Sequence, residues 1–188
     1  MKLADLVKPK ACSVLGIDAS TNSVAFCLIN NGYPVKWGKI EFAGSDIFEK
    51  IVDAKIKMHA MLTELKSDYI AIEGAVLVRS ADAVIKLSYV YGAVIAELMT
   101  TGSKVTTISP TAWQAKIGNK NPTKAEKEAI RAKNPGYAES WYKNQLRNMR
   151  KQRTCDWALS RFNINVTDYD VADAIGIAYY AYEELTKR

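Results

Sequence analysis

The hydrophobic residues of the chain change their period once, near residue 43, and this change limits the folds that the chain can adopt. Between residues 13 and 42 the apolar runs are short and are separated by polar turn residues such as Asn31-Gly32, a pair typical of a tight hairpin. From 45 to 66 the apolar residues recur every three or four positions, with Ser45 or Asp46 as the cap. We therefore expect three antiparallel strands followed by an amphipathic helix.

The rest of the chain alternates between strands and helices. Apolar runs predict strands at 68–74 and 105–108, and helices at 80–101 and at about 171–185. The interval 109–165 is interrupted by proline and glycine, so we expect short helices with polar joins there. The 188 residues suffice for one well-packed domain. The prediction is a single α/β domain, 1–188, whose mixed sheet combines an antiparallel three-stranded meander with parallel strands and is flanked by helices.

The net charge of +6 is concentrated in one segment. Residues 104–161 contain 13 Lys and Arg against 4 Asp and Glu, whereas the remainder contains 13 basic and 16 acidic residues. This asymmetry indicates a polyanionic partner. A charged face that is merely solvated is an equally common explanation.

The chain shows neither a membrane segment nor a secretion signal. No run approaches the roughly 20 uninterrupted apolar residues that a membrane helix needs, and residues 1–10 carry charges where a signal peptide needs an apolar core. The three cysteines, Cys12, Cys27 and Cys155, are odd in number and widely spaced, which excludes a disulfide framework built on all of them. We expect an intracellular protein in a reducing compartment.

Four acidic residues stand in apolar surroundings, where an ionised carboxylate is costly unless a partner compensates its charge. Asp18 interrupts one apolar run and Glu73 ends another, while Asp170 and Asp173 are spaced i, i+3 and so share one helix face, roughly 5–6 Å apart. Carboxylate oxygens are hard ligands suited to Mg²⁺ or Mn²⁺, and two such ions can activate water for phosphodiester hydrolysis. The set therefore predicts a metal-dependent nuclease.

Each acid taken alone has a simpler explanation. Asp170 could cap a helix, Asp18 could sit in a turn, and Glu73 could form a salt bridge, since perturbed carboxylates are often structural. The first loop, residues 16–22, also looks like the phosphate loop of actin-like ATPases and sugar kinases. Those proteins are two-lobed and longer, and this chain lacks a second glycine-rich nucleotide loop. The combination of four acids favours the nuclease.

Four sequence blocks resemble the RuvC family of Holliday-junction resolvases, nucleases with an RNase H-like fold, and more loosely its phage and poxvirus members. The blocks are Leu15-Gly16-Ile17-Asp18; Ala71-Ile72-Glu73; Ala81-Asp82 with Lys86-Leu87 and Gly92; and Asp170-Val171-Ala172-Asp173-Ala174. Their order and separations agree with the family over most of the chain. This match is far more specific than any single acid.

The resemblance implies a structure-selective endonuclease that binds four-way DNA junctions as a homodimer and resolves them with paired symmetric nicks. The four acids would be both the catalytic residues and the ligands of Mg²⁺ or Mn²⁺, with two ions in each site. Lys124 lies six residues after Gly118, as does a family residue that supports catalysis. A second family lysine aligns with Trp113, close to Lys116. Ser88, Gly92 and Ala96 form a flat helix face that either packs on the sheet or contributes to the dimer.

Basic residues are the predicted DNA contacts, because phosphate contacts position DNA without reading its sequence. They are Arg79, Lys116, Lys120, Lys127, Arg131, Lys143, Arg147, Arg150, Lys151 and Arg153. Where many relatives have an aromatic wedge, this chain has Val76-Leu77-Val78, so Leu77 is the candidate for opening the junction. Trp141 and Tyr142 are candidates for stacking on unpaired bases, although aromatic residues in a helix are more often packed.

Two rival functions remain open at this point. One is a less selective flap or branched-DNA nuclease on the same fold. The other is a junction-binding protein without turnover. The four acids argue against the second rival, since a binding module gains nothing by holding negative charge against phosphates.

Overall fold

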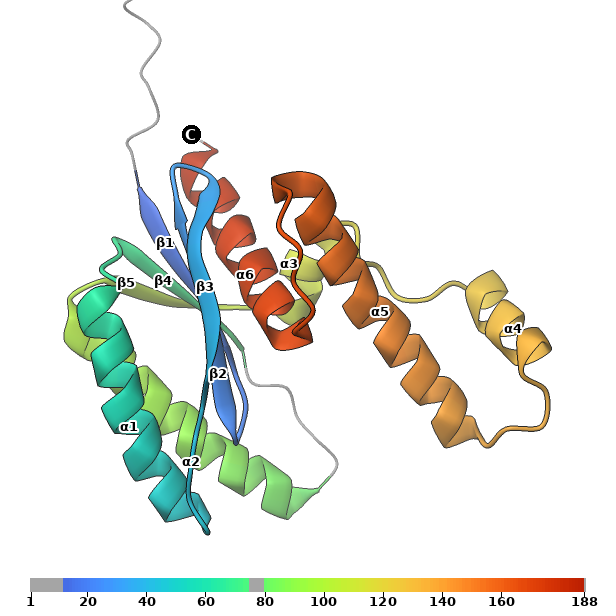
Figure 1. The fold of residues 1–188 in the computed structure, drawn as a ribbon, viewed down its shortest axis with the longest axis horizontal. Coiled ribbons are helices and arrows are strands. Elements are labelled where there is room, and N and C mark those ends of the chain that lie inside the picture. Colours follow the sequence, from blue (N-terminus) through green and yellow to red (C-terminus); the bar gives the residue numbers. More distant parts are fainter. Residues whose placement is uncertain (1–11, 75–79, 188) are drawn as a thin grey trace, which may run out of the picture.

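The computed structural model describes residues 12–74 and 80–187 (Figure 1). The strands are β1 (Ser13–Ala19), β2 (Ser23–Asn30), β3 (Tyr33–Glu41), β4 (Tyr69–Glu73) and β5 (Lys104–Ile108). The helices are α1 (Ile47–Glu64), α2 (Ala81–Leu98), α3 (Pro110–Lys116), α4 (Lys124–Lys133), α5 (Glu139–Phe162) and α6 (Tyr169–Thr186), with a 3-10 turn, η2 (Met99–Thr101), directly after α2.

The strands form one five-stranded sheet in the order β3-β2-β1-β4-β5. The pairs β1–β2 and β2–β3 are antiparallel, whereas β4 pairs in parallel with β1 and β5 in parallel with β4. This arrangement confirms the predicted mixed sheet with its opening meander. The predicted cap of the first helix is also present, because the Asp46 side chain accepts hydrogen bonds from the first turn of α1.

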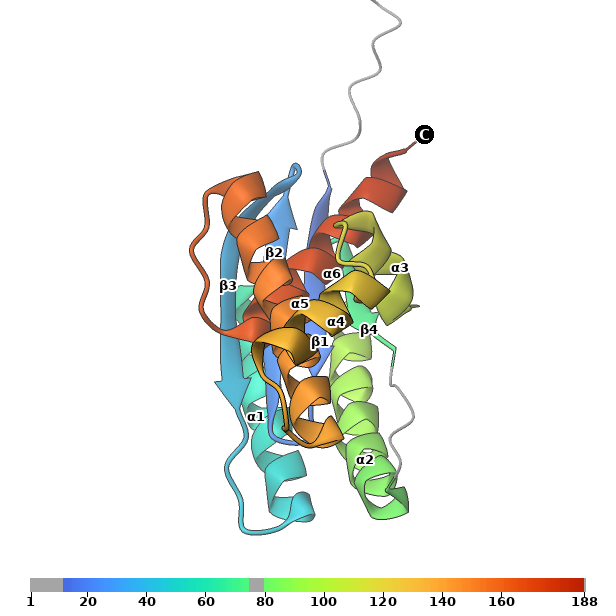
Figure 2. The ribbon, with the colours of Figure 1, turned by 90° about the vertical axis from the view of Figure 1, so that its right-hand side faces the viewer.

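Helices cover both faces of the sheet (Figures 1 and 2). Side chains alternate along β1, so that Leu15 and Ile17 pack in the cluster formed with α1 and α2. Val14 belongs to the opposite cluster, formed with α3 and α6. The helix α5 lies against α6 on that second side, where Cys155 and Ala158 are buried.

Gly16 lets α6 lie directly on the central strand. A Cβ atom at this position would stand 2.5 Å from the backbone oxygen of Ala174 and 2.5 Å from the backbone nitrogen of Ala178. Only a residue without a side chain permits this approach. The Gly-Ile-Asp motif therefore has a structural reason, since it brings α6 against the strand that carries Asp18.

The interval 109–165 is more regular than the sequence predicted. The expectation of short helices was wrong for residues 139–162, which form the single 24-residue helix α5. Proline and glycine do not occur between Ala138 and Phe162, so nothing breaks the helix, and its last half packs on α6. Figure 1 shows its first half projecting away from the sheet beside α4.

The segment Ala81–Thr101, which contains α2, is by length and composition apolar enough to cross a membrane. It carries the charged residues Asp82, Lys86 and Glu97, and its Val90 and Val94 are buried in the core cluster with α1 and the sheet. We interpret α2 as a core helix with one exposed face.

Candidate active site

Asp18 and Glu73 lie side by side because of the register between β1 and β4. Ile17 pairs with Ile72 in the parallel ladder, so the next residue of each strand is an acid. Both acids point to the opposite face from Ile17 and Ile72, toward α6. The C-terminal ends of two neighbouring inner strands thus place two carboxylates side by side.

The start of α6 supplies the other two acids. The side chain of Asp168 caps this helix and accepts hydrogen bonds from the backbone nitrogens of Asp170, at 2.9 Å, and Val171, at 3.2 Å. The capping role considered for Asp170 therefore belongs to Asp168. Asp170 and Asp173 follow on one face of the first turns, and Asp173 directly precedes Ala174, which contacts Gly16.

The electrostatics show that the four acids form one group. Burial, followed by the negative charges of Glu73, Asp173 and Asp170, raises the pKa of Asp18 from 3.8 to about 8. Burial likewise raises the pKa of Asp173 to about 7, with Lys151 opposing the shift. Burial also raises the pKa of Glu73, against a hydrogen bond from Trp113. A group of buried carboxylates like this one favours a cation as its partner.

Asp170 behaves differently from the other three acids. Burial acts to raise its pKa, but hydrogen bonds from Lys39 and Lys151 outweigh burial and hold the pKa below its usual value. Lys39 Nζ lies 2.6 Å from Asp170 Oδ2, and Lys151 Nζ lies 3.1 Å from Asp170 Oδ1. Lys151 therefore lies within the acid site, although the sequence predicted it only as a DNA contact.

Two neutral side chains orient the acids. Trp113 Nε1 donates to Glu73 Oε1 at 2.8 Å, and its buried ring lies where a Cβ on Gly176 would stand only 2.7 Å away. Thr154 is fully buried and donates a hydrogen bond that lowers the pKa of Asp173. Asn119 Nδ2 in turn lies 3.0 Å from Thr154 Oγ1. Trp113, the position that the resemblance aligned with a family lysine, thus contacts an acid through a neutral donor.

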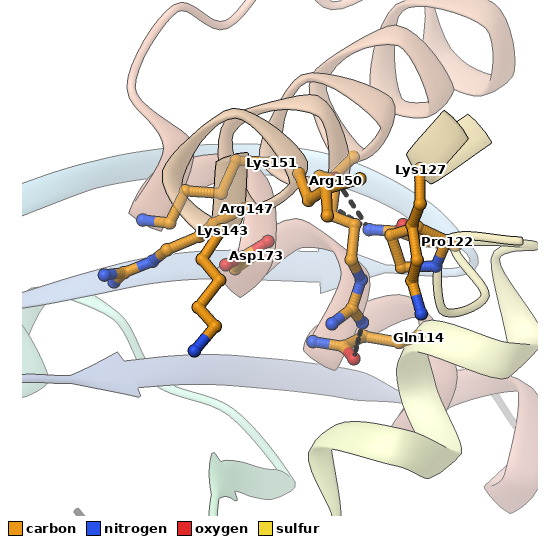
Figure 3. A pocket seen from close by; sticks show the side chains of 11 residues that line it. Gln114, Pro122, Lys127, Lys143, Arg147, Arg150, Lys151 and Asp173 are labelled. Carbon is orange, nitrogen blue, oxygen red and sulfur yellow. Dashed lines mark hydrogen bonds between the residues drawn. The ribbon is translucent and has the colours of Figure 1, made fainter. Parts of the chain in front are cut away.

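A basic cavity of about 380 Å³ opens beside Asp173, between α5 and the α3–α4 region (Figure 3). Its lining includes five of the predicted DNA contacts, Lys127, Lys143, Arg147, Arg150 and Lys151. Arg150 donates a hydrogen bond to Gln114, while its buried Nε has no hydrogen-bond partner among the residues that the structure describes. The structure therefore brings part of the predicted basic surface next to the acids.

The other predicted DNA contacts lie elsewhere. Lys116 forms an ion pair with Glu183 at 3.2 Å. Glu183 follows Asp173 by ten residues on α6, so this pair lies ~15 Å along the helix from Asp173. Arg131 on α4 pairs with Glu139 in the first turn of α5. Arg153 on α5 pairs with Glu126 on α4, so both arginines join these two helices. Lys120 is exposed, and its carbonyl oxygen accepts a bond from Arg153.

Lys124, the predicted catalytic lysine, has a side chain that is 91% exposed at the start of α4 and pairs with Glu128 at 3.8 Å. In residues 12–74 and 80–187, its ammonium group forms no ion pair with the four acids. Leu77 and Arg79 lie outside the described residues. Tyr142 is buried, which agrees with the packed alternative for this aromatic residue.

Lys39 is the site residue that the sequence did not reveal. It belongs to β3, an edge strand with mostly exposed side chains, and is separated from Asp170 by 131 positions. A lysine on an edge strand is common and carries no signal by itself. For Trp113, the departure from the family lysine was a usable signal, but its contact with Glu73 was not predictable.

The acids are grouped but not yet arranged as a ligand set. Within the described ranges, no three His, Cys, Asp or Glu side chains converge closely enough to hold an ion as they stand. The carboxylate of Asp170 is hydrogen-bonded to Lys39 and Lys151. The donor chemistry, four carboxylates in partly buried positions, fits Mg²⁺ or Mn²⁺.

A mixed sheet in this order, with acids at the ends of β1 and β4 and on α6, defines a nuclease with an RNase H-like fold. Comparison with protein families gives a match over residues 14–133 to the family described as crossover junction endodeoxyribonuclease RuvC. The chain therefore belongs to the RuvC family. Asp18 and Glu73 lie within the matched residues, whereas Asp170 and Asp173 follow them.

Solved structures extend the likeness over nearly the whole chain. The structure of RuvC from Thermus thermophilus in complex with Holliday junction substrate is 13% identical, covers 92% of this chain and 94% of that chain, and has a TM-score of 0.66. Another structure of the same enzyme gives a TM-score of 0.62 at 13% identity, over 92% and 95% of the two chains.

The yeast mitochondrial Holliday junction resolvase Ydc2 gives a TM-score of 0.52 at 11% identity, over 98% of this chain and 85% of that one. Identities this low show a shared fold and no more. A comparison with curated protein sequences gives no match. The family assignment, with its crossover junction endodeoxyribonuclease activity, therefore rests on the family match, and the fold agrees with it.

Proposed function

We propose that this chain resolves four-way DNA junctions by hydrolysing phosphodiester bonds at a site built from Asp18, Glu73, Asp170 and Asp173. The observation that carries the proposal is the gathering of these acids at the ends of β1 and β4 and the start of α6, in a member of the RuvC family. Because its substrate is cellular DNA, we place the enzyme inside the cell.

Metal ions suit the charge of this site. Three of the four acids have a raised pKa, caused first by burial and, for Asp18 and Asp173, also by neighbouring negative charge. A divalent cation relieves that repulsion. Two Mg²⁺ or Mn²⁺ ions, when bound, supply an activated water and stabilise the leaving oxygen. The only histidine, His59, pairs with Glu97 on α2, so no imidazole takes part.

The DNA strand reaches the acids along α5. Lys143, Arg147 and Lys151 repeat every four residues and so form one stripe, ~12 Å long, that ends at Asp170. Figure 3 shows these three side chains on the side of α5 where Asp173 lies. At the start of the helix, the exposed Tyr137 ring stacks on Trp141 with centroids 4.3 Å apart. We assign the stripe to phosphates and the ring pair to unpaired bases.

A second copy of the chain fits the exposed apolar face of α1 and α2. On α1, Phe48, Val52 and Ile56 repeat every four residues and are each at least 60% exposed. The Phe48 ring stacks on Tyr89 of α2, which joins the two helices into one patch. Ser88, Gly92 and Ala96 are on α2, and all three are exposed. Paired nicks in a symmetric junction require two sites, which a homodimer supplies.

Introducing one charged side chain into the exposed apolar face of α1 and α2 tests whether this face forms the dimer. Val52→Glu should convert the dimer to a monomer in sedimentation analysis, because a buried, unpaired carboxylate is costly. Val35→Glu is the matched control, since Val35 on β3 is 56% exposed and lies outside the patch. A Val52→Glu protein that remains as dimeric as this control would exclude the face.

Substrate choice separates the proposal from a broader branched-DNA nuclease. Four-way junctions, flaps, forks and linear duplexes of one sequence should be digested side by side with Mg²⁺, and the cut positions mapped on each strand. We expect paired, symmetric nicks in the junction at a rate well above that for the other substrates. Equal cleavage of flaps and junctions would favour the broader nuclease, and junction binding without any cleavage would favour a binding protein.

A further inference from the structure

Both carboxylate oxygens of Asp170 have a positively charged partner. Lys39 approaches Oδ2 from β3, and Lys151 approaches Oδ1 from α5. In residues 12–74 and 80–187, these two lysines form the only ion pairs with any of the four acids. Both ammonium groups compete with a divalent cation for Asp170, because positive charges at a few ångströms repel each other.

Each lysine has a second anchor beside Asp170. Lys39 Nζ lies 3.3 Å from Asp168 Oδ2, and Lys151 Nζ lies 5.4 Å from the centre of the Tyr169 ring. Both lysine side chains are only 24% exposed, so the protein holds them in place. An ammonium group that leaves Asp170 therefore remains at the start of α6.

The position of the second anchors also suits a DNA phosphate. Lys151 is the last residue of the basic stripe on α5 and lines the cavity together with Asp173. Lys39 reaches the same carboxylate from the other side. A phosphodiester group brought to the acids meets four negative carboxyl groups, and among the described residues these two ammonium groups are the ones that form ion pairs with those acids.

We propose that Lys39 and Lys151 hold Asp170 while the metal site is empty and bind the scissile phosphate when Asp170 serves as a metal ligand. Both lysines are then catalytic residues for junction cleavage. The inference rests on the proposed role of Asp170 as a ligand. It assigns the lysines two effects of opposite sign: they weaken metal binding in the absence of DNA, and they speed cleavage in its presence.

The first effect is measured by titrating the purified protein with Mn²⁺ alone. Lys39→Gln and Lys151→Gln should each bind Mn²⁺ roughly tenfold more tightly than the wild type, about 1.4 kcal/mol. Lys36→Gln is the matched control, because Lys36 also lies on β3 and pairs with the distant Glu64. In an Asp170→Asn background, the two lysine variants should lose their effect on Mn²⁺ binding. Unchanged or weaker Mn²⁺ binding by both single variants overturns the competition.

The second effect is measured by single-turnover cleavage of a labelled junction at saturating Mn²⁺. Lys39→Gln and Lys151→Gln should cleave at least tenfold more slowly, and Lys36→Gln should match the wild type. Wild-type rates in both variants would overturn the catalytic role. Thermal melts of each variant exclude unfolding as the cause. If the wild type itself cuts no junction, the proposed function fails, whereas the Mn²⁺ titration still decides whether the lysines hold Asp170.

Discussion

Replacing Asp18 by Asn should stabilise the metal-free protein. The pKa of Asp18 is raised from 3.8 to about 8, so the native state keeps a proton that the unfolded chain releases. Moving the pKa over that interval corresponds to about 6 kcal/mol if Asp18 alone carried it. Because Glu73, Asp173 and Asp170 contribute to the shift and titrate with it, we expect about half of that value for Asp18→Asn at pH 8.5.

The pH dependence gives the sign of this effect. Between pH 4 and 8 the native state binds more protons than the unfolded state, so wild-type stability falls as pH rises through this window and levels off above about pH 8. Asn carries no charge at any pH. The advantage of Asp18→Asn should therefore be small near pH 4, increase through neutrality, and reach its full size above about pH 8.

The assay is thermal unfolding of both proteins in a metal chelator, from pH 5 to pH 9. A difference of about 3 kcal/mol corresponds to roughly 6–12 °C in a domain of this size. Asp46→Asn, at the exposed cap of α1, is a matched control that should show no such pH dependence. If wild type and Asp18→Asn unfold at the same temperature across this range, Asp18 is not held in a cluster of mutually repelling acids.

Three further outcomes follow from the same geometry. Gly16→Ala should destabilise the fold by about 2–3 kcal/mol in urea unfolding, because the new methyl group would lie 2.5 Å from backbone atoms of α6. A loss of stability below half that value would refute the close approach. Mn²⁺ affinity in a binding titration should rise between pH 6 and pH 8.5 and then level off, because Asp173 and Asp18 release protons with pKa values of about 7 and about 8. A constant Mn²⁺ affinity over this range would contradict their role as ligands. Arg147→Gln should reduce the salt dependence of junction binding by about one phosphate contact in a filter-binding series, and an unchanged slope would remove α5 from the DNA path.

The sheet and the acids were predictable because local sequence determines them. The change in hydrophobic period marks the end of the meander, and Asp46 caps the helix that follows. Both features depend on neighbours in the chain, which the sequence displays directly. The Gly-Ile-Asp block could likewise be recognised as a local motif, although the steric reason for its glycine, contact with Ala174 and Ala178, lies far along the chain.

The partners of the acids were less predictable, because they come from distant parts of the chain. Lys39 reaches Asp170 across 131 positions, and Trp113 reaches Glu73 across 40. The long helix α5 was missed for another reason. It begins without a side-chain cap at Ala138 and is rich in polar residues, so the breakers before it dominated the prediction. Its regularity comes from the uninterrupted sequence and from packing on α6.

Cleavage of a labelled four-way junction by wild type and by Asp173→Asn tests the central claim most directly. Asn has nearly the same shape as Asp but is a weaker ligand, so binding to DNA should survive while metal-supported hydrolysis is lost. With Mg²⁺ present, we expect the wild type to nick the junction and Asp173→Asn to bind it with similar affinity without cutting. Cleavage by Asp173→Asn at the wild-type rate would contradict the account.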